Sequence, residues 1–198
     1  NMSLRKDGRN IFADETDKFG LSQDAYYFIG GLMKHVYSMT AITNPLVNSY
    51  KRLVSGFEAP LHITWSVTNR SPLIRIPSSF GSGTRIELRS PDSAANPYLT
   101  IALCLAAGLD VIKNKITPPE NIQKNIFHMT EEEKEQLHIK SLPTNLYDAV
   151  CAMEKDAFIR EVLGEHISNV YIGSKKDEWN RYCRAVTEWE VDTYLDKF

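Results

Sequence analysis

The sequence reads KRLVSGFEAP at residues 51–60, NRSPLIRIP at 69–77 and TRIELRSPDSAANPY at 84–98, and these three stretches set its architecture. Between Lys51 and Arg89 the chain holds five arginines but two carboxylates, although its formal net charge is −2. A guanidinium group is a planar fork of donors that suits carboxylate and phosphate. We therefore predict a site for a polyanionic ligand, built on Arg52, Arg70, Arg75, Arg85 and Arg89.

The charged side chains of these stretches alternate with aliphatic ones. Successive side chains of a strand point to opposite faces, so Arg85, Glu87 and Arg89 would share one face. Arg75 lies between two isoleucines and repeats the pattern. This alternation predicts a sheet with one buried side and one charged side. A solvated outer face with Arg–Glu pairs worth about 0–1 kcal/mol each fits the same pattern, but the excess of arginine favours anion binding.

Two carboxylates accompany the arginines. Glu87 lies among three of them, and a carboxylate near bound phosphates is a ready ligand for Mg²⁺. Glu58 lies in a loop bracketed by Gly56 and Pro60. Taken alone, that loop is more typical of an exposed acid, and the alternative is a lid whose carboxylate closes over a substrate.

Helix and strand signals alternate in a simple order along the chain. Ser22 is a candidate N-cap for a helix that runs to about Thr40, and Gly30-Gly31 within it indicate close packing. Asn96-Pro97 begins a nearly all-apolar helix to about Lys113, which we expect to be buried. Apolar segments predict three strands, at Leu61–Val67, Leu73–Ile76 and Thr84–Leu88.

The C-terminal half reads as helical. Thr130 and Glu133 form a capping box for a short helix. One or two helices should follow over Asn145–Leu163, ending at Gly164, and His166–Lys197 should be amphipathic and mostly helical. We expect Trp179, Trp189 and Tyr194 to anchor that last segment. The whole order predicts an α+β fold, with an antiparallel sheet that has a charged ligand face and is packed by helices.

Composition narrows the class of protein further. The 198 residues, 42% of them hydrophobic, suit one soluble domain. A net charge of −2 argues against general coating of nucleic acid, and the longest apolar run is too short to cross a membrane. Three widely spaced cysteines match neither a disulfide framework nor a metal site, so we expect a cytoplasmic protein.

The three arginine stretches resemble conserved blocks of glutamine synthetase. The matching strings are N-S-Y-K-R-L-V-x-G-[FY]-E-A-P, N-R-S-x-x-I-R-I-P and R-[IV]-E-[LV]-R-x-P-D-x-x-A-N-P-Y. The resemblance extends over residues 1–198 and is to the type I enzymes. It implies the C-terminal portion of a glutamine synthetase/guanido kinase-like catalytic domain, with the small N-terminal domain and the first part of the catalytic domain lying upstream of Asn1.

The resemblance implies an ATP-dependent ligase that joins ammonia to L-glutamate through γ-glutamyl phosphate. Arg52 and Arg89 would then bind the substrate. Glu58 would be the flap acid that takes a proton from ammonium. The full-length parent would be a homo-oligomer, in this family a ring dodecamer, and the chain alone would be inactive and would expose apolar surface.

The nucleotide and metal sites follow from the same resemblance. Arg70 and Arg75 would bind the ATP phosphates and the transferring phosphoryl group, Arg70 with a catalytic role. Arg85 and Ser3 would contact the nucleotide. Glu87 would hold one of the divalent ions, Mg²⁺ or Mn²⁺.

Other functions are compatible with the same residues. A relative that ligates a polyamine or another amine to the γ-carboxylate of glutamate would keep all of them. A structural or regulatory protein of the same fold would need none, and joint retention of these side chains argues against it. A guanidino kinase shares arginine-based phosphate binding but not these strings.

Overall fold

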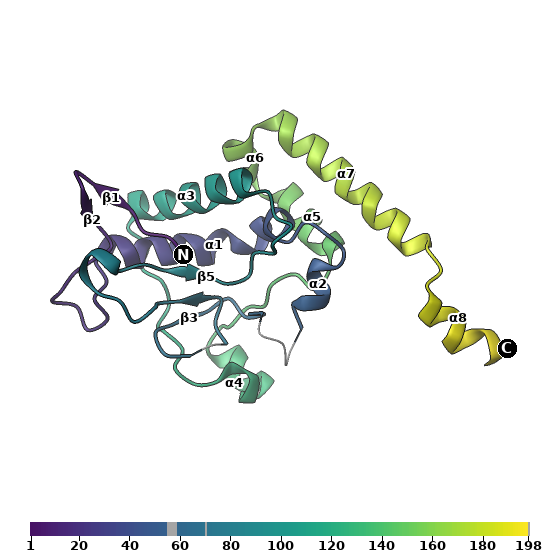
Figure 1. Ribbon diagram of the computed structural model, residues 1–198, viewed down its shortest axis with the longest axis horizontal. Helices are drawn as coiled ribbons and strands as arrows, with labels where there is room; N and C mark the ends of the chain where they lie inside the picture. Colours follow the sequence, from purple (N-terminus) through teal and green to yellow (C-terminus); the bar gives the residue numbers. More distant parts are fainter. Residues whose placement is uncertain (55–58, 70, 198) are drawn as a thin grey trace.

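The computed structural model describes residues 1–54, 59–69 and 71–197 (Figure 1). The main helices are α1 (Gln23–Thr43), α2 (Ser49–Arg52), α3 (Pro97–Asn114), α4 (Glu131–Gln136), α5 (Leu146–Lys155), α6 (Ala157–Leu163), α7 (Glu165–Arg184) and α8 (Glu188–Tyr194). The strands are β1 (Arg5–Lys6), β2 (Arg9–Asn10), β3 (Trp65–Ser66), β4 (Ile74–Arg75) and β5 (Glu87–Leu88). Short 3-10 turns are η1 (Gly81–Gly83), η2 (Ile126–His128) and η3 (Leu195–Lys197). The α+β class predicted from the sequence is confirmed.

The central sheet has three strands in the order β3-β4-β5. β4 and β5 pair antiparallel as predicted, but β3 and β4 run parallel, so the sheet is mixed. The strands are also shorter than predicted. Pro72 and Pro77 flank β4 closely, and proline has no N–H to extend a ladder of hydrogen bonds.

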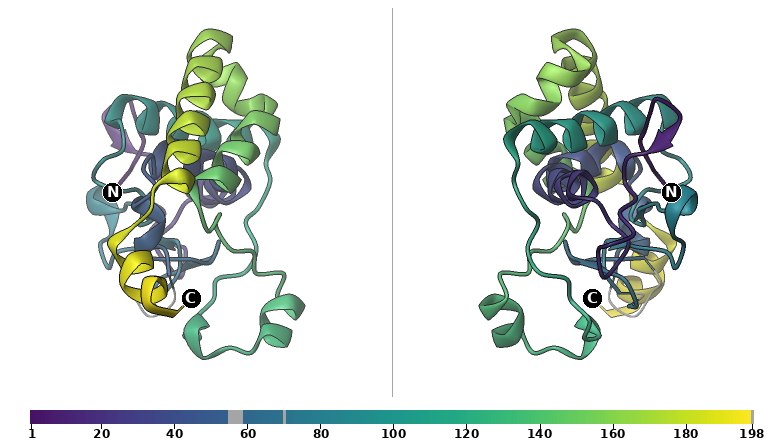
Figure 2. Two further views of the ribbon diagram at one scale, coloured as in Figure 1. Left: turned by 90° about the vertical axis from the view of Figure 1, so that its right-hand side faces the viewer. Right: turned by 90° about the vertical axis from the view of Figure 1, so that its left-hand side faces the viewer.

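The two long helices α1 and α3 lie side by side above this sheet (Figures 1 and 2). Ser22 caps α1 by accepting from the N–H of Ala25, as its sequence position predicted. A Cβ on Gly31 would lie 2.0 Å from the carbonyl oxygen of Ala107 in α3. The predicted close packing at the paired glycines is therefore confirmed, and it lets the helix backbones approach each other.

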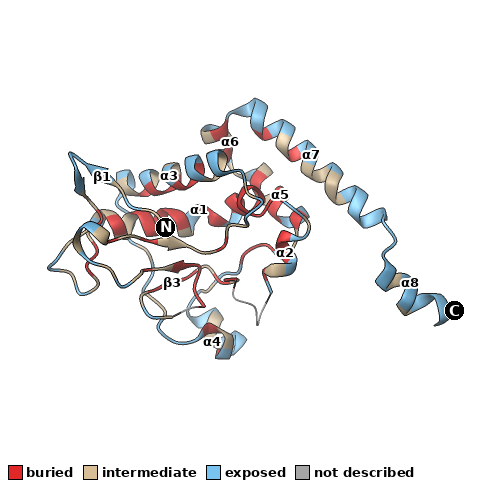
Figure 3. Cartoon of the chain, viewed as in Figure 1, coloured by how far each residue is buried: buried red, intermediate tan, exposed pale blue. Residues whose placement is uncertain are grey.

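One face of α3 is not buried, contrary to the prediction for this helix. Leu103, Ala107 and Val111 are fully buried against the core. On the opposite side Tyr98 is 83% exposed and Ile101 is 65% exposed (Figure 3). The prediction from the nearly all-apolar sequence was wrong because α1 covers one face of α3 and no described element covers the other face.

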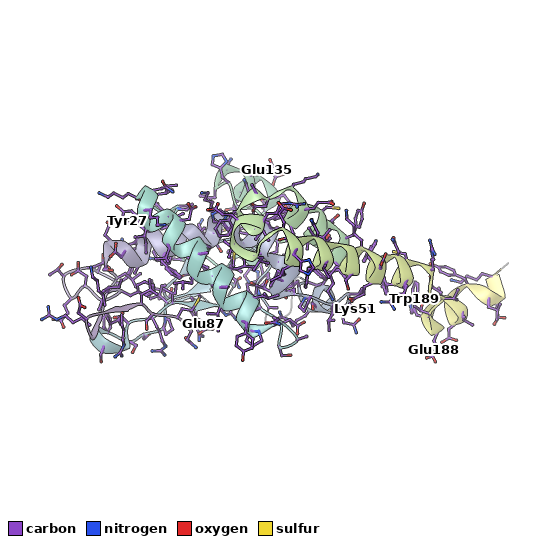
Figure 4. All side chains as sticks on the ribbon, turned by 90° about the horizontal axis from the view of Figure 1, so that it is seen from above. Tyr27, Lys51, Glu87, Glu135, Glu188 and Trp189 are labelled. Atoms are coloured by element: carbon purple, nitrogen blue, oxygen red, sulfur yellow. The ribbon has the colours of Figure 1, made fainter. Side chains whose placement is uncertain are left out.

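α5 and α6 lie against the body, and α7 and α8 lead away from it (Figure 1). α5 and α6 meet at Asp156, whose side chain caps α6, and Gly164 ends α6 with a φ of 80°, as its C-cap position predicted. Trp179 packs partly buried against the core. Trp189, 64% exposed, and Tyr194, 48% exposed, lie on the projecting end (Figure 4). Of the three expected anchors only Trp179 serves as one here.

Smaller elements follow their local signals. Asp7 and Gly8 both have positive φ and join β1 to β2 in a tight hairpin. Thr130 and Glu133 form the predicted capping box of α4. None of the described helices combines the length and apolar character that a membrane span requires.

Candidate active site

Two charged side chains face each other across β4 and β5. Arg75 and Glu87 are register partners, and their neighbours Ile74 and Leu88 pair on the other face of the sheet. Nη2 of Arg75 lies 2.6 Å from Oε2 of Glu87. The alternation predicted from the sequence therefore places both groups on one face, where the side chain of Arg75 stays 40% exposed.

Arg89 joins this pair from the end of β5. Its Nε lies 3.6 Å from Oε1 of Glu87, and its Nη1 donates to the carbonyl oxygen of Pro72. Glu87 thus lies between two guanidinium groups, each near one of its oxygens. Such an arrangement fixes the direction of all three side chains before any ligand binds.

Arg52 approaches the same region from the end of α2. Its Nη2 donates to Oδ1 of Asn44 at 3.0 Å and also to the carbonyl oxygen of Ser90. Ser90 directly follows Arg89, so these contacts tie α2 and the C-cap of α1 to the end of β5. The Nε atom of Arg52 is buried without a hydrogen-bond partner in the structure.

The N-terminal segment lies along the free edge of β5. Met2 and Ile86 form an antiparallel bridge with N–H···O distances of 2.7 and 2.9 Å. Ser3 is exposed beside this bridge. Arg85 donates from Nε to Oδ1 of Asn1 at 3.3 Å and from Nη1 to the carbonyl oxygen of Gly83. Arg85 and Ser3 are therefore brought to the same sheet as Glu87.

Two predicted site residues, Glu58 and Arg70, lie outside the described residues. The chain on either side of Arg70 is held in place. Asn69 Oδ1 accepts from the N–H of Ser71 at 2.9 Å, and Leu73 accepts from the N–H of Arg89 at 3.0 Å.

The cluster formed by Arg52, Arg75, Arg85, Glu87 and Arg89, called here the arginine cluster, is strongly cationic. Nε of Arg75, like Nε of Arg52, is buried and has no hydrogen-bond partner. An unpaired buried donor is costly unless a ligand satisfies it. Nearby, a hydrogen bond from the N–H of Ala94 and the charge of Arg52 help lower the pKa of the Asp92 carboxyl.

The described residues contain no group of three or more metal-binding side chains. Glu87 nevertheless suits an ion that is held mainly by the phosphates of a ligand and by water, because Mg²⁺ in such sites takes one or two protein carboxylates. The residues present therefore fit a phosphate-bound divalent ion, with Glu87 as its protein ligand.

Sequence reasoning missed the partners that orient the arginines. Asn44, which is fully buried, is the main one. Asn44 directly precedes Pro45, a pair typical of a loop, and nothing in that pair indicates a contact with Arg52. The sequence gives no indication of the other two contacts. Ser90 uses its backbone carbonyl, and Asn1 lies far along the chain from Arg85.

Comparison with known proteins identifies the family of the chain. The sequence model of the glutamine synthetase catalytic domain matches residues 1–194. The chain belongs to the glutamine synthetase family. Relatives named glutamine synthetase include those of Clostridium saccharobutylicum, 52% identical over all of this chain and 45% of the relative, and Methanosarcina mazei, 54% identical over 98% of this chain and 44% of the relative. The chain thus spans slightly under half the length of these glutamine synthetases.

Solved structures of the same family share the fold. A structure described as a GmaS/ADP complex superimposes with a TM-score of 0.82 at 41% identity, over 96% of this chain and 43% of that one. A ligand-free GmaS structure gives a TM-score of 0.80 at 41% identity. The likeness covers nearly the whole of this chain.

Proposed function

We propose that this chain is the C-terminal portion of a glutamine synthetase catalytic domain, and that a protein of the relatives' length carrying it ligates ammonia to L-glutamate with ATP. The observation that carries the proposal is the arginine cluster itself. Two guanidinium groups, those of Arg75 and Arg89, flank the carboxylate of Glu87, and the Nε atoms of Arg52 and Arg75 are buried without partners. Such a cluster suits two anionic substrates that must meet.

The reaction divides into two displacements. The γ-carboxylate of glutamate attacks the γ-phosphorus of ATP, which forms γ-glutamyl phosphate and releases ADP. Ammonia then attacks the acyl carbon, which forms glutamine and releases phosphate. Negative charge gathers on the transferring group during the first step, and fixed cationic donors stabilise it.

Within this scheme each side chain has one task. Arg52 and Arg89 bind glutamate, with Arg52 held by Asn44. Arg70 and Arg75 bind the phosphates and the transferring group. Glu58 takes the proton that ammonium must lose before ammonia can attack.

The remaining predicted residues would hold the nucleotide and its ion. Arg85 and Ser3, on the edge of β5, contact the nucleotide. Glu87 holds a Mg²⁺ or Mn²⁺ ion, which when bound neutralises phosphate charge. A ligand-bound GmaS is described with ADP, which supports a nucleotide in this fold. Assembly into a homo-oligomeric ring is part of the same proposal for the whole protein.

Calorimetric titration of the 198-residue chain with ATP and Mg²⁺ tests the nucleotide site directly. We expect Arg75→Ala to weaken binding at least about tenfold, because a bidentate phosphate contact is lost. Arg181→Ala, which removes an exposed arginine of α7, is the matched control and should leave the affinity unchanged. Equal affinities for all three proteins would overturn the proposed nucleotide site.

Activity is tested in a protein of the relatives' length. Phosphate release from ATP should require both glutamate and ammonia, and glutamine should accumulate in equal amount. Phosphate release with a larger amine in place of ammonia would instead indicate that the protein is a γ-glutamyl-amine ligase. No release with any amine would favour a structural or regulatory role.

A further inference from the structure

A cavity of about 650 Å³ lies between α1 and the segment that connects α3 to α4. Figures 1 and 2 show this segment descending from α3 past α1 toward α4. None of the residues that line the cavity belongs to the arginine cluster. Its volume falls within the range of small-molecule sites. The cavity is therefore a second candidate site, independent of the proposed reaction.

Apolar groups line part of this cavity. Met33 of α1, Ile63, Ile116 and Pro118 all line it. A Cβ on Gly30 would lie 2.9 Å from the carbonyl oxygen of Ile116, so the connecting segment crosses α1 closely at that glycine. These surfaces suit a compact apolar or aromatic group.

Hydrogen bonds hold the walls in place. The indole N–H of Trp65, a buried residue of β3, donates to the carbonyl oxygen of Pro119 at 2.7 Å. The N–H of Ile63 donates to the carbonyl oxygen of Lys140, also at 2.7 Å. The first bond ties the segment at Pro119 to β3, and the second joins two residues that both line the cavity, so the site is formed before a ligand enters.

Three of the lining residues are basic. Lys34, His138 and Lys140 line the cavity, and none of the described lining residues is an aspartate or glutamate. Lys34 is partly neutralised by Asp110, 2.7 Å away, while Lys140 has an exposed side chain. A cavity lined by both cationic and apolar groups is complementary to a molecule with one anionic end and one apolar end.

We propose that this cavity binds a small apolar monocarboxylate, with its hydrocarbon part against Met33 and Pro118 and its carboxylate beside Lys34 and Lys140. This goes beyond the ligase proposal, because it assigns a separate site to a molecule that is neither substrate nor product.

Calorimetric titration of the 198-residue chain with 3-phenylpropionate tests the proposal, and 3-phenylpropionamide serves as the uncharged probe of the same shape. We expect the acid to bind at least about tenfold more tightly than the amide. The double variant Lys34→Met, Lys140→Met should remove this preference, because it keeps the length of both side chains but not their charge. Lys155→Met, on the exposed end of α5 and outside the cavity, is the matched control and should keep it.

Several outcomes would overturn the proposal. Equal affinity for acid and amide would show adsorption to exposed apolar surface. Binding that survives in the double lysine variant but is lost in Arg75→Ala would place the probe in the arginine cluster. Absence of binding by the acid would show that the cavity does not take this class of ligand. Circular dichroism of each variant confirms that the fold is retained.

Discussion

Arg75 and Glu87 are direct cross-strand partners, and their charged atoms lie 2.6 Å apart on the one face of the sheet that also carries Arg89. Glu87 therefore competes with any anion for two guanidinium groups. In the proposed active site Glu87 would hold a divalent ion instead, and the guanidinium groups would then be available to the phosphates.

Glu87→Gln should lower the preference for metal-bound over metal-free nucleotide that the proposed site implies. Without the carboxylate, Arg75 loses its ion-pair partner, so metal-free ATP should bind more tightly. The ratio of the ATP affinity with Mg²⁺ to the ATP affinity without it should fall by about tenfold or more. Titrations with ATP in the presence of either Mg²⁺ or a chelator measure both quantities.

Glu178→Gln provides the control for that experiment. Glu178 forms an ion pair with Lys175 on α7, at 2.7 Å, and should affect neither titration. A ratio of the two affinities that is the same in Glu87→Gln as in the unmodified chain would contradict the role given to Glu87.

Asn44→Ala should destabilise the fold by about 1–3 kcal/mol, since it removes a fully buried acceptor from a charged donor, Arg52. Urea unfolding followed by circular dichroism measures the change. Asn169→Ala removes an equivalent Oδ1–arginine contact, 3.0 Å from Arg160, but on an exposed helix surface. It should change the unfolding free energy by less than about 0.5 kcal/mol, and equal losses in both variants would argue against Asn44 as the buried support of Arg52.

The sequence predicted the elements that depend on local chemistry. The hydroxyl groups of Ser22 and Thr130 cap the starts of α1 and α4, as predicted. Gly164, which has no side chain, ends α6. The alternation of charge around Glu87 likewise predicted which side chains share a face, because the period of a strand is fixed by its geometry.

What the sequence did not predict depends on contacts between distant segments. The parallel pairing of β3 with β4 follows from the path of the chain through Asn69, which strand periodicity does not report. The exposure of one face of α3 and of Trp189 could not be predicted either. An apolar side chain is buried only where another element packs against it, and the local sequence does not show which element that is. For the same reason the buried support of Arg52 by Asn44 was missed.

Gly31→Ala should destabilise the chain by about 1–3 kcal/mol, because the new Cβ would lie 2.0 Å from the backbone oxygen of Ala107 and α1 and α3 would have to separate. Gly173→Ala in α7 is the matched change, since a Cβ there meets nothing within 4 Å. It should stabilise the chain by about 0.5–1 kcal/mol through helix propensity alone. Thermal and urea unfolding of both variants measure these effects, and a loss of stability in neither would refute the close approach of the two helices.

Stability should also fall in mildly acidic solution because of His62. Burial, together with the charge of Lys134, lowers the pKa of this histidine, although Glu131 opposes the shift. As the pH falls below about 6.5, the ordinary pKa of histidine, the unfolded chain takes up a proton that the folded chain does not. The unfolding free energy should therefore be fully retained above this pH and decline below it. 

His62→Gln keeps a partner for the hydroxyl of Ser141, which lies 3.1 Å from Nδ1 of His62, but cannot titrate. Urea unfolding at intervals between pH 8 and pH 5 should show a flatter dependence on pH in this variant than in the unmodified chain. His128→Gln, at an exposed position, should leave the slope unchanged. If His62→Gln preserves the full slope instead, the acid sensitivity arises elsewhere, and the buried contact between His62 and the Ser141 segment does not govern it.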